Sequence, residues 1–186
     1  MEQTYAIELK NITKRFGKIV ANDGINLKVK RGEILSLLGE NGSGKTTLMN
    51  MISGIYFPDE GHILVDGKAV SIRSPKDSFD LGIGMIHQHF KLIDVMTAAE
   101  NIILGLKGNA VLDMKKVHKD IQELVDRYGF DLDPAQKVYT MSVSQKQTVE
   151  IVKMLYRGAN ILILDEPTAV LTPQEVDKLF EVLRNM

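Results

Sequence analysis

The sequence predicts an α/β fold, and three observations predict it. A glycine-rich loop stands between an apolar run and a helical pattern, over residues 39–46. Short runs with alternating apolar and polar residues lie before it and after it, as in half-exposed antiparallel strands. A second continuous apolar run, Ile161–Leu164, suits a strand that is covered on both faces. With 186 residues, the chain is long enough for one sizeable core, or for a core with a small appended subdomain.

The glycine-rich loop is the most informative stretch of the chain. It reads Gly39, Glu40, Asn41, Gly42, Ser43, Gly44, Lys45, Thr46 and is followed by Thr47. Glycines let successive backbone N–H groups point at phosphate oxygens, and the helix that follows presents its positive end to them. Lys45 can reach the β- and γ-phosphates of a nucleotide, and Thr46 offers a hydroxyl to Mg²⁺. With a buried strand expected over 33–38 and a helix over 47–52, the sequence predicts a P-loop; an ordinary glycine-rich turn is the alternative.

Two carboxylates close the second apolar run. Asp165 and Glu166 follow Leu164 directly, so both emerge at the carboxyl end of a buried strand, where open α/β sheets bind ligands. Asp165 can hold Mg²⁺, directly or through water, and Glu166 can polarise an attacking water. A capped turn is the alternative for this pair alone. In a chain that also carries the loop at 39–46, the metal and base assignment is favoured.

The remaining segments alternate between strand and helix patterns. Strands are expected over 5–9, 25–29, 62–65, 68–72 and 82–86, and Asp66-Gly67 is a hairpin signal. An amphipathic helix is expected between Asp113 as N-cap and Gly129 as C-terminal stop; Lys115, Lys116 and Lys119 then form its solvated face rather than a binding patch. A further helix is expected from around Ser144 to Gly158.

The last expected helix begins with Thr172 as cap, Pro173 in the first turn and Glu175 completing a capping box. A crossover helix normally leads back into another parallel strand, and none follows before Met186. The sequence is therefore expected to be a truncated piece of a longer polypeptide.

Composition narrows the classes of partner. Lys and Arg number 23 against 24 Asp and Glu, so no basic excess points to nucleic acid as an electrostatic partner. The absence of cysteine excludes disulfides, thiolate metal sites and cysteine nucleophiles. The first ten residues lack the pattern of a signal peptide, and no run approaches eighteen apolar residues. Any role at a membrane is therefore expected to come through a partner.

Four motifs together resemble the ATP-binding cassette of an ABC transporter, and they run through nearly the whole chain. In order they are the loop at 39–46, the segment 85–90 around Gln88, the segment 141–145, and the strand end at 165–167. The resemblance implies a RecA-like P-loop core with an N-terminal antiparallel β-subdomain and a helical subdomain. The expected parts are 1–33 with 61–74 for the β-subdomain, 34–60 with 75–90 and 158–186 for the core, and 91–157 for the helical subdomain.

The resemblance also implies roles for single residues. Gln88 stands where the family has a glutamine that contacts the metal or its water and moves with the membrane partner. Ser142 stands where a serine holds the γ-phosphate of ATP bound on the opposite subunit. Phe16 is the candidate for an aromatic ring that stacks on adenine, and packing in the core is its alternative.

The chain departs from the family pattern at three places. The signature Leu-Ser-Gly-Gly-Gln reads Met-Ser-Val-Ser-Gln here, with Ser144 in place of the second glycine. If the backbone there needs φ > 0, Ser144 impairs this half-site; if Ser144 is an ordinary N-cap, it is tolerated. A histidine some thirty residues after Glu166 contacts the γ-phosphate in the family, and no histidine of this chain can fill that role. Leu171 stands where many family members have an aspartate, in the loop that crosses to the partner subunit. His87 and His89 alternate as metal ligands would, but no third ligand stands nearby.

The function that the resemblance implies is ATP binding and hydrolysis by a subunit that powers an importer for nucleosides or simple sugars. ATP and Mg²⁺ are the expected cofactors, and Lys45, Gln88 and Glu166 the expected catalytic residues. The expected partners are membrane permease subunits, a second ATPase domain and, indirectly, a substrate-binding protein, at the cytoplasmic face of the membrane. No nucleic acid is expected as a partner. Two alternatives stay open: a soluble ATPase of this family that acts on ribosomes or DNA, and an ATP-binding module without turnover.

Overall fold

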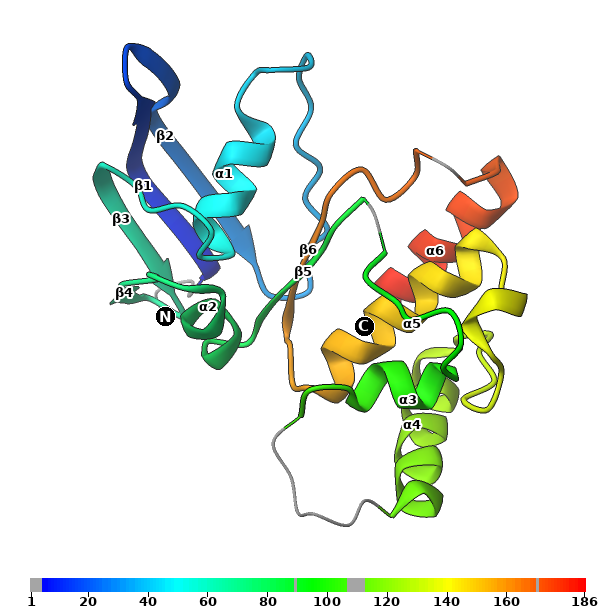
Figure 1. Ribbon diagram of the computed structural model, residues 1–186. Helices are drawn as coiled ribbons and strands as arrows, with labels where there is room; N and C mark the ends of the chain where they lie inside the picture. The colour runs from blue at the N-terminus through cyan, green and yellow to red at the C-terminus, as the bar shows by residue number, and fades with distance from the viewer. Residues whose placement is uncertain (1–4, 89, 107–112, 170) are drawn as a thin grey trace. The chain divides into compact units, whose positions relative to one another are not determined.

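In the computed structural model, two compact units form, Met1–Gly84 and Met85–Met186 (Figure 1). The structure describes residues 5–88, 90–106, 113–169 and 171–186. The finer division of the chain into a β-subdomain, a core and a helical subdomain stays a prediction.

The first unit is built on a four-stranded antiparallel sheet in the order β2-β1-β3-β4. Its strands are β1 (Tyr5–Phe16), β2 (Ile19–Lys30), β3 (Glu60–Val65) and β4 (Lys68–Val70). Leu9 in the central strand pairs with Leu27 on one side and with Ile63 on the other. Leu9 and Ile63 are buried, as the alternation of apolar and polar residues predicts. The four strands predicted for this part of the chain are confirmed, and β1 and β2 are longer than expected.

The hairpin between β3 and β4 forms where Asp66-Gly67 predicts it. Val65 pairs with Lys68, which leaves two residues in the turn. Asp66 has φ 50° and Gly67 has φ 75°, and positive φ at both central residues is the geometry of a type I′ turn.

Two helices complete the first unit, α1 (Lys45–Ile52) and α2 (Pro75–Asp80). Helix α1 follows the glycine-rich loop as predicted, and its Leu48, Met51 and Ile52 are buried. Helix α2 begins at Ser74, whose side chain accepts a hydrogen bond from the Asp77 N–H.

The buried strand predicted over 33–38 is wrong. These residues form neither strand nor helix, and Ile34, Leu35 and Leu38 are exposed. An apolar run expresses a preference for burial, whereas a strand also needs neighbours that supply ladder hydrogen bonds. No strand of the first unit's sheet pairs with this segment, so its sequence alone does not make it a strand.

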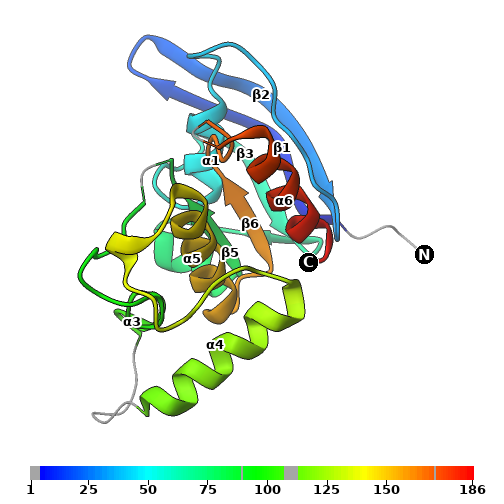
Figure 2. The same cartoon turned by 90° about the vertical axis from the view of Figure 1, so that its right-hand side faces the viewer.

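The second unit is mainly helical (Figures 1 and 2). Its helices are α3 (Ala98–Ile103), α4 (Met114–Tyr128), the short 3₁₀ helix η1 (Val138–Thr140), α5 (Val143–Tyr156) and α6 (Pro173–Arg184). Ile102, Ile121, Val149 and Val152 are fully buried in the core that α3, α4 and α5 share. Strand β6 (Ile161–Leu164) pairs with β5 (Ile83–Ile86) in a two-stranded sheet.

The ends of α4 and α6 lie where the capping signals place them. The Asp113 side chain accepts from the N–H groups of Lys115 and Lys116, and Gly129 ends α4 with φ 73°. Thr172 and Glu175 form the predicted capping box at the start of α6. Among the described residues, no helix combines the length and apolarity that a membrane crossing requires.

Candidate functional site

The glycine-rich loop of the first unit forms an open cradle for an anion. Gly42 and Gly44 have φ 83° and 90°, which a residue with a side chain rarely adopts. A Cβ on Gly39 would lie 2.8 Å from the Ser43 Oγ, so a side chain there would displace the Ser43 hydroxyl. Helix α1 starts at Gly44 without a side-chain cap and without an acidic residue in its first turn. Its first N–H groups therefore remain available to a phosphate.

Lys45 supplies the positive charge of the cradle, and hydrogen bonds to the loop hold its ammonium group in place. Its Nζ donates to the carbonyl oxygens of Gly39 at 2.6 Å and Glu40 at 2.8 Å, and lies 3.4 Å from the Ser43 Oγ. The ammonium group is thus folded back over the loop that precedes it. Thr46 is exposed beside it, so its hydroxyl is accessible to a metal ion. The residues present therefore fit a triphosphate: amide donors, one ammonium group and a glycine-rich backbone.

Asn22 supports the cradle from β2, and the sequence analysis missed it. Its side chain is buried, and Nδ2 donates to the Gly44 carbonyl oxygen at 3.3 Å. A Cβ on Gly44 would lie only 2.3 Å from the Ala21 carbonyl oxygen, so β2 and the loop touch through backbone. A polar residue at an inward position of a strand was the available signal.

Phe16 lies at the end of β1 and is 41% exposed, so it is not a core residue. Its ring meets Tyr56 edge to face, with centroids 5.1 Å apart. The Lys14 Nζ stands 5.5 Å from the ring centroid. The core alternative is therefore wrong, and a surface ring that can stack on a base remains.

Gln88, Asp165 and Glu166 come together in the second unit. The Gln88 Nε2 donates to the Glu166 Oε2 at 3.1 Å, and the Asp165 N–H donates to the Ile86 carbonyl oxygen at 3.0 Å. The three side chains line one hollow, with Gln147 and Phe90 also on its wall. Residues 78 positions apart in sequence are thus adjacent, as the motif assignment predicts.

Glu166 has a left-handed backbone with φ 47°. Non-glycine residues in this region carry strain of about 1 kcal/mol or more, and such strain collects at functional sites. The turn that follows is closed by the Ala169 N–H, which donates to the Glu166 carbonyl oxygen. The carboxylate is exposed at this turn, while Asp165 is half-buried.

The segment 141–145 leads into the first turn of α5, and the expectation for Ser144 needs correction. Ser142 is the N-cap: its Oγ accepts from the Gln145 N–H, and the Gln145 side chain accepts from the Ser142 N–H. Ser144 is the second residue of α5 and is not among the described residues with positive φ. It is neither the N-cap nor a strained substitute for glycine. The physical reason to expect an impaired signature is therefore absent.

The histidine hypothesis gains no support. His89 lies outside the described residues, so the proposed pair with His87 has no structural description. Among the parts of the chain that are described, no group of three His, Asp or Glu side chains is arranged to hold a metal ion.

Comparison with known proteins decides the family. The family described as ABC transporter matches residues 22–169, a span that includes the glycine-rich loop, Gln88, α5 and Glu166. The chain belongs to the ABC transporter family. The motif that carries the cradle is therefore this family's P-loop, and the matched span also includes the strand end at Asp165.

Relatives of this ABC chain include two nucleoside import ATP-binding proteins. It is 53% identical over 184 residues to the guanosine import ATP-binding protein NupO of Bacillus subtilis, covering 98% of this chain and 36% of that protein. It is 52% identical over 188 residues to the nucleoside import ATP-binding protein NupA of Lactococcus lactis, covering 100% and 37%. The chain thus spans little more than a third of the length of these relatives.

A solved structure shares the fold. The cbiO1 protein of Clostridium perfringens, described as part of the ABC transporter complex cbiONQ, matches with a TM-score of 0.83 at 30% identity. The match covers 98% of this chain and 74% of that one. The α/β fold with an antiparallel sheet that the sequence predicts is therefore confirmed.

Proposed function

We propose that this chain binds and hydrolyses ATP to power an ABC importer whose substrate is a nucleoside or a simple sugar. The observation that carries the proposal is the P-loop cradle, where Lys45 and glycine-rich backbone form an anion site ahead of α1. The similarity to nucleoside import proteins supports the substrate class. Substrate choice itself belongs to the permease and binding protein that such a subunit serves.

Each residue has a proposed part in binding. Backbone amides of residues 39–47, with Lys45, bind the phosphates, and Phe16 stacks on the adenine. Thr46, Gln88 and Asp165 hold Mg²⁺ through oxygen atoms, the ligands that this ion prefers. When bound, Mg²⁺ supplies charge neutralisation at the phosphates.

Glu166 is the proposed general base. Its carboxylate accepts a proton from water as the water oxygen bonds to the γ-phosphorus and the bond to the β-phosphate oxygen breaks, leaving ADP and phosphate. Gln88 donates to Glu166, which holds that carboxylate in one orientation. Ser142 is proposed to donate a hydrogen bond to the γ-phosphate of ATP on a second cassette. Its Oγ accepts from the Gln145 N–H, and the hydroxyl hydrogen can still be donated to such a phosphate.

The proposed partners are a second ATPase domain, membrane permease subunits and, through them, a substrate-binding protein. The proposed location is the cytoplasmic face of the membrane, reached by contact with the permease. Residues 90–97, which follow Gln88, are the proposed contact with the permease. No nucleic-acid partner is proposed, because positive and negative charges are balanced.

The test is Glu166→Gln in the native polypeptide with its permease. Loss of a general base lowers the rate by about 10² to 10⁴, so ATP turnover and uptake of a labelled nucleoside or ribose fall together while ATP binding is retained. Glu181→Gln, an exposed change on α6, is the matched control and leaves both rates unchanged. Full ATP turnover in Glu166→Gln would contradict the assignment of the base.

A further inference from the structure

We propose that Gln147 and Glu150 are positioning residues that tie the loop carrying Glu166 and the segment after Gln88 to helix α5. The inference rests on the proposed ATPase function. Ser142 is the N-cap of α5, so the helix proposed to contact ATP on a second cassette also supports Glu166 and Gln88 of this cassette.

Gln147 holds the Glu166 loop. Its side chain is 4% exposed, and its Nε2 donates to the Pro167 carbonyl oxygen at 3.0 Å. Pro167 is the residue after Glu166, whose backbone is left-handed. The strained turn that presents the carboxylate is thus anchored one residue away by a buried side chain. An anchor of this kind is what keeps a strained conformation populated.

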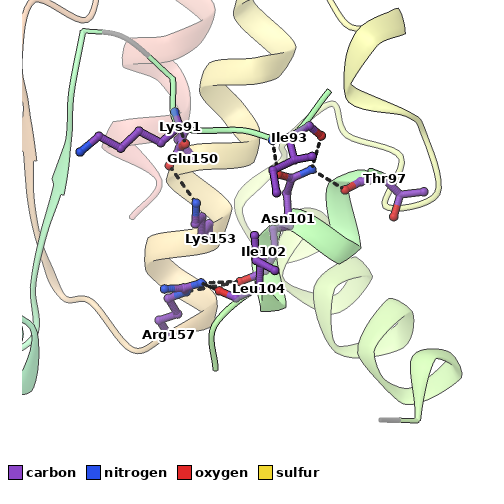
Figure 3. A network of polar contacts seen from close by, with 9 residues as sticks. All are labelled: Lys91, Ile93, Thr97, Asn101, Ile102, Leu104, Glu150, Lys153 and Arg157. Atoms are coloured by element: carbon purple, nitrogen blue, oxygen red, sulfur yellow. Dashed lines mark hydrogen bonds and ion pairs between the residues drawn. The ribbon is translucent and has the colours of Figure 1, made fainter. Parts of the chain in front are cut away.

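Glu150 holds the segment after Gln88. Its side chain is buried, and its Oε1 accepts from the Lys91 N–H at 3.1 Å. Its Oε2 lies 3.6 Å from the Lys153 Nζ, which compensates the buried charge (Figure 3). The tie is made three residues after Gln88, the residue that contacts Glu166.

The two side chains stand three positions apart, and residues at that spacing share one face of a helix. A third contact from the same part of α5 reinforces the tie: the Lys146 Nζ lies 3.1 Å from the Asp94 Oδ1. Ile93, in the segment after Gln88, is held by buried Asn101 of α3 (Figure 3). The Asn101 Oδ1 accepts from the Ile93 N–H, and the Asn101 Nδ2 donates to the Ile93 carbonyl oxygen. Residues 91–94 are therefore held to the helices at three points.

Packing alone does not explain these residues. Burying an amide or a carboxylate costs free energy unless each is hydrogen-bonded, and an apolar side chain would fill the space without that cost. The polar groups of Gln147 and Glu150 add specificity of position, because each forms a hydrogen bond with one particular backbone group of one loop. A displacement of residues 91–94 therefore reaches α5 through Glu150, and the Glu166 turn through Gln147.

The experiment compares three variants in the native polypeptide assembled with its permease. Gln147→Met keeps the volume but removes the donor, and Glu150→Ala removes the acceptor. Glu150→Gln is the matched control, because its amide oxygen can still accept from the Lys91 N–H. We measure kcat and KM for ATP, normalised to the fraction of protein that binds ATP, so that loss of folded protein does not enter the rates.

The expected result is a fall in kcat of about tenfold or more for Gln147→Met and Glu150→Ala, with KM unchanged. Glu150→Gln keeps kcat within about threefold of the wild type. If Gln147→Met and Glu150→Ala keep the wild-type kcat, or raise only KM, the positioning role is overturned. If the wild type itself shows no ATP turnover, or Glu166→Gln turns over ATP normally, the proposed function fails instead.

Discussion

Gly44 is the residue on which the shape of the P-loop depends most. It has φ 90°, and a Cβ there would lie 2.3 Å from the Ala21 carbonyl oxygen and 2.9 Å from the Asn22 Nδ2. A side chain at Gly44 is therefore disfavoured for two reasons: the left-handed backbone conformation, and the lack of space beside β2. Either the loop or β2 has to move when a methyl group is added.

We therefore expect Gly44→Ala to weaken ATP binding and to lower the free energy of unfolding by more than the ~1–2 kcal/mol of the left-handed backbone alone. Gly17→Ala is the control: Gly17 has φ 58°, and a Cβ there meets nothing within 4 Å. Urea unfolding and ATP titration of both variants give the comparison. Equal losses of stability in the two would show that the contact with Ala21 is unimportant.

For single residues, the sequence indicates candidates for the chemistry but not the contacts that hold them in place. The spacing of residue types singles out Lys45, Asp165 and Glu166, and their roles stay predictions; the structure adds that Glu166 lies within hydrogen-bond distance of Gln88. The roles of Asn22 and Gln147 depend on neighbours 22 and 20 residues away, which no local pattern contains. For Ser144 the resemblance left two alternatives, a strained backbone or an N-cap. Neither holds, because Ser144 lies inside α5, two residues after the N-cap Ser142.

Helix α4 shows how far local signals specify an element. Its apolar stripe, the Asp113 cap and the Gly129 stop all lie within the segment itself, and all three expectations are confirmed. The segment 33–38 shows the limit, because a strand depends on partners that lie elsewhere in the chain. Elements whose boundaries are set by their own side chains are therefore the predictable ones.

Removal of the α4 caps has a predictable effect. Asp113→Ala leaves the N–H groups of Lys115 and Lys116 without their acceptor and should cost about 1 kcal/mol. Gly129→Ala should cost a similar amount, ~1–2 kcal/mol, because φ is 73°. Lys119→Ala, which loses only an exposed contact with Glu123, should stay within about 0.5 kcal/mol. Chemical unfolding measures all three, and a Lys119→Ala loss as large as the cap losses would refute the capping argument.

For the whole molecule, ATP and folding are linked. A ligand that binds only the folded chain stabilises it by about 2.7 kcal/mol when its concentration is a hundred times its Kd. For a chain of this length, 1 kcal/mol raises Tm by about 2–4 °C. Saturating Mg²⁺ and ATP should therefore raise Tm by roughly 5–10 °C.

Lys45→Ala tests whether that shift comes from the P-loop. The variant loses the ammonium group that lies over residues 39 and 40. Each charge-assisted hydrogen bond from such a group to a bound phosphate contributes about 1.5–3 kcal/mol to binding. Weakening of ATP binding by that amount or more removes most of the Tm shift. The Tm without nucleotide changes little, because the side-chain hydrogen bonds of Lys45 to described residues stay within its own exposed loop. A wild-type Tm shift in Lys45→Ala would place the nucleotide somewhere other than the P-loop.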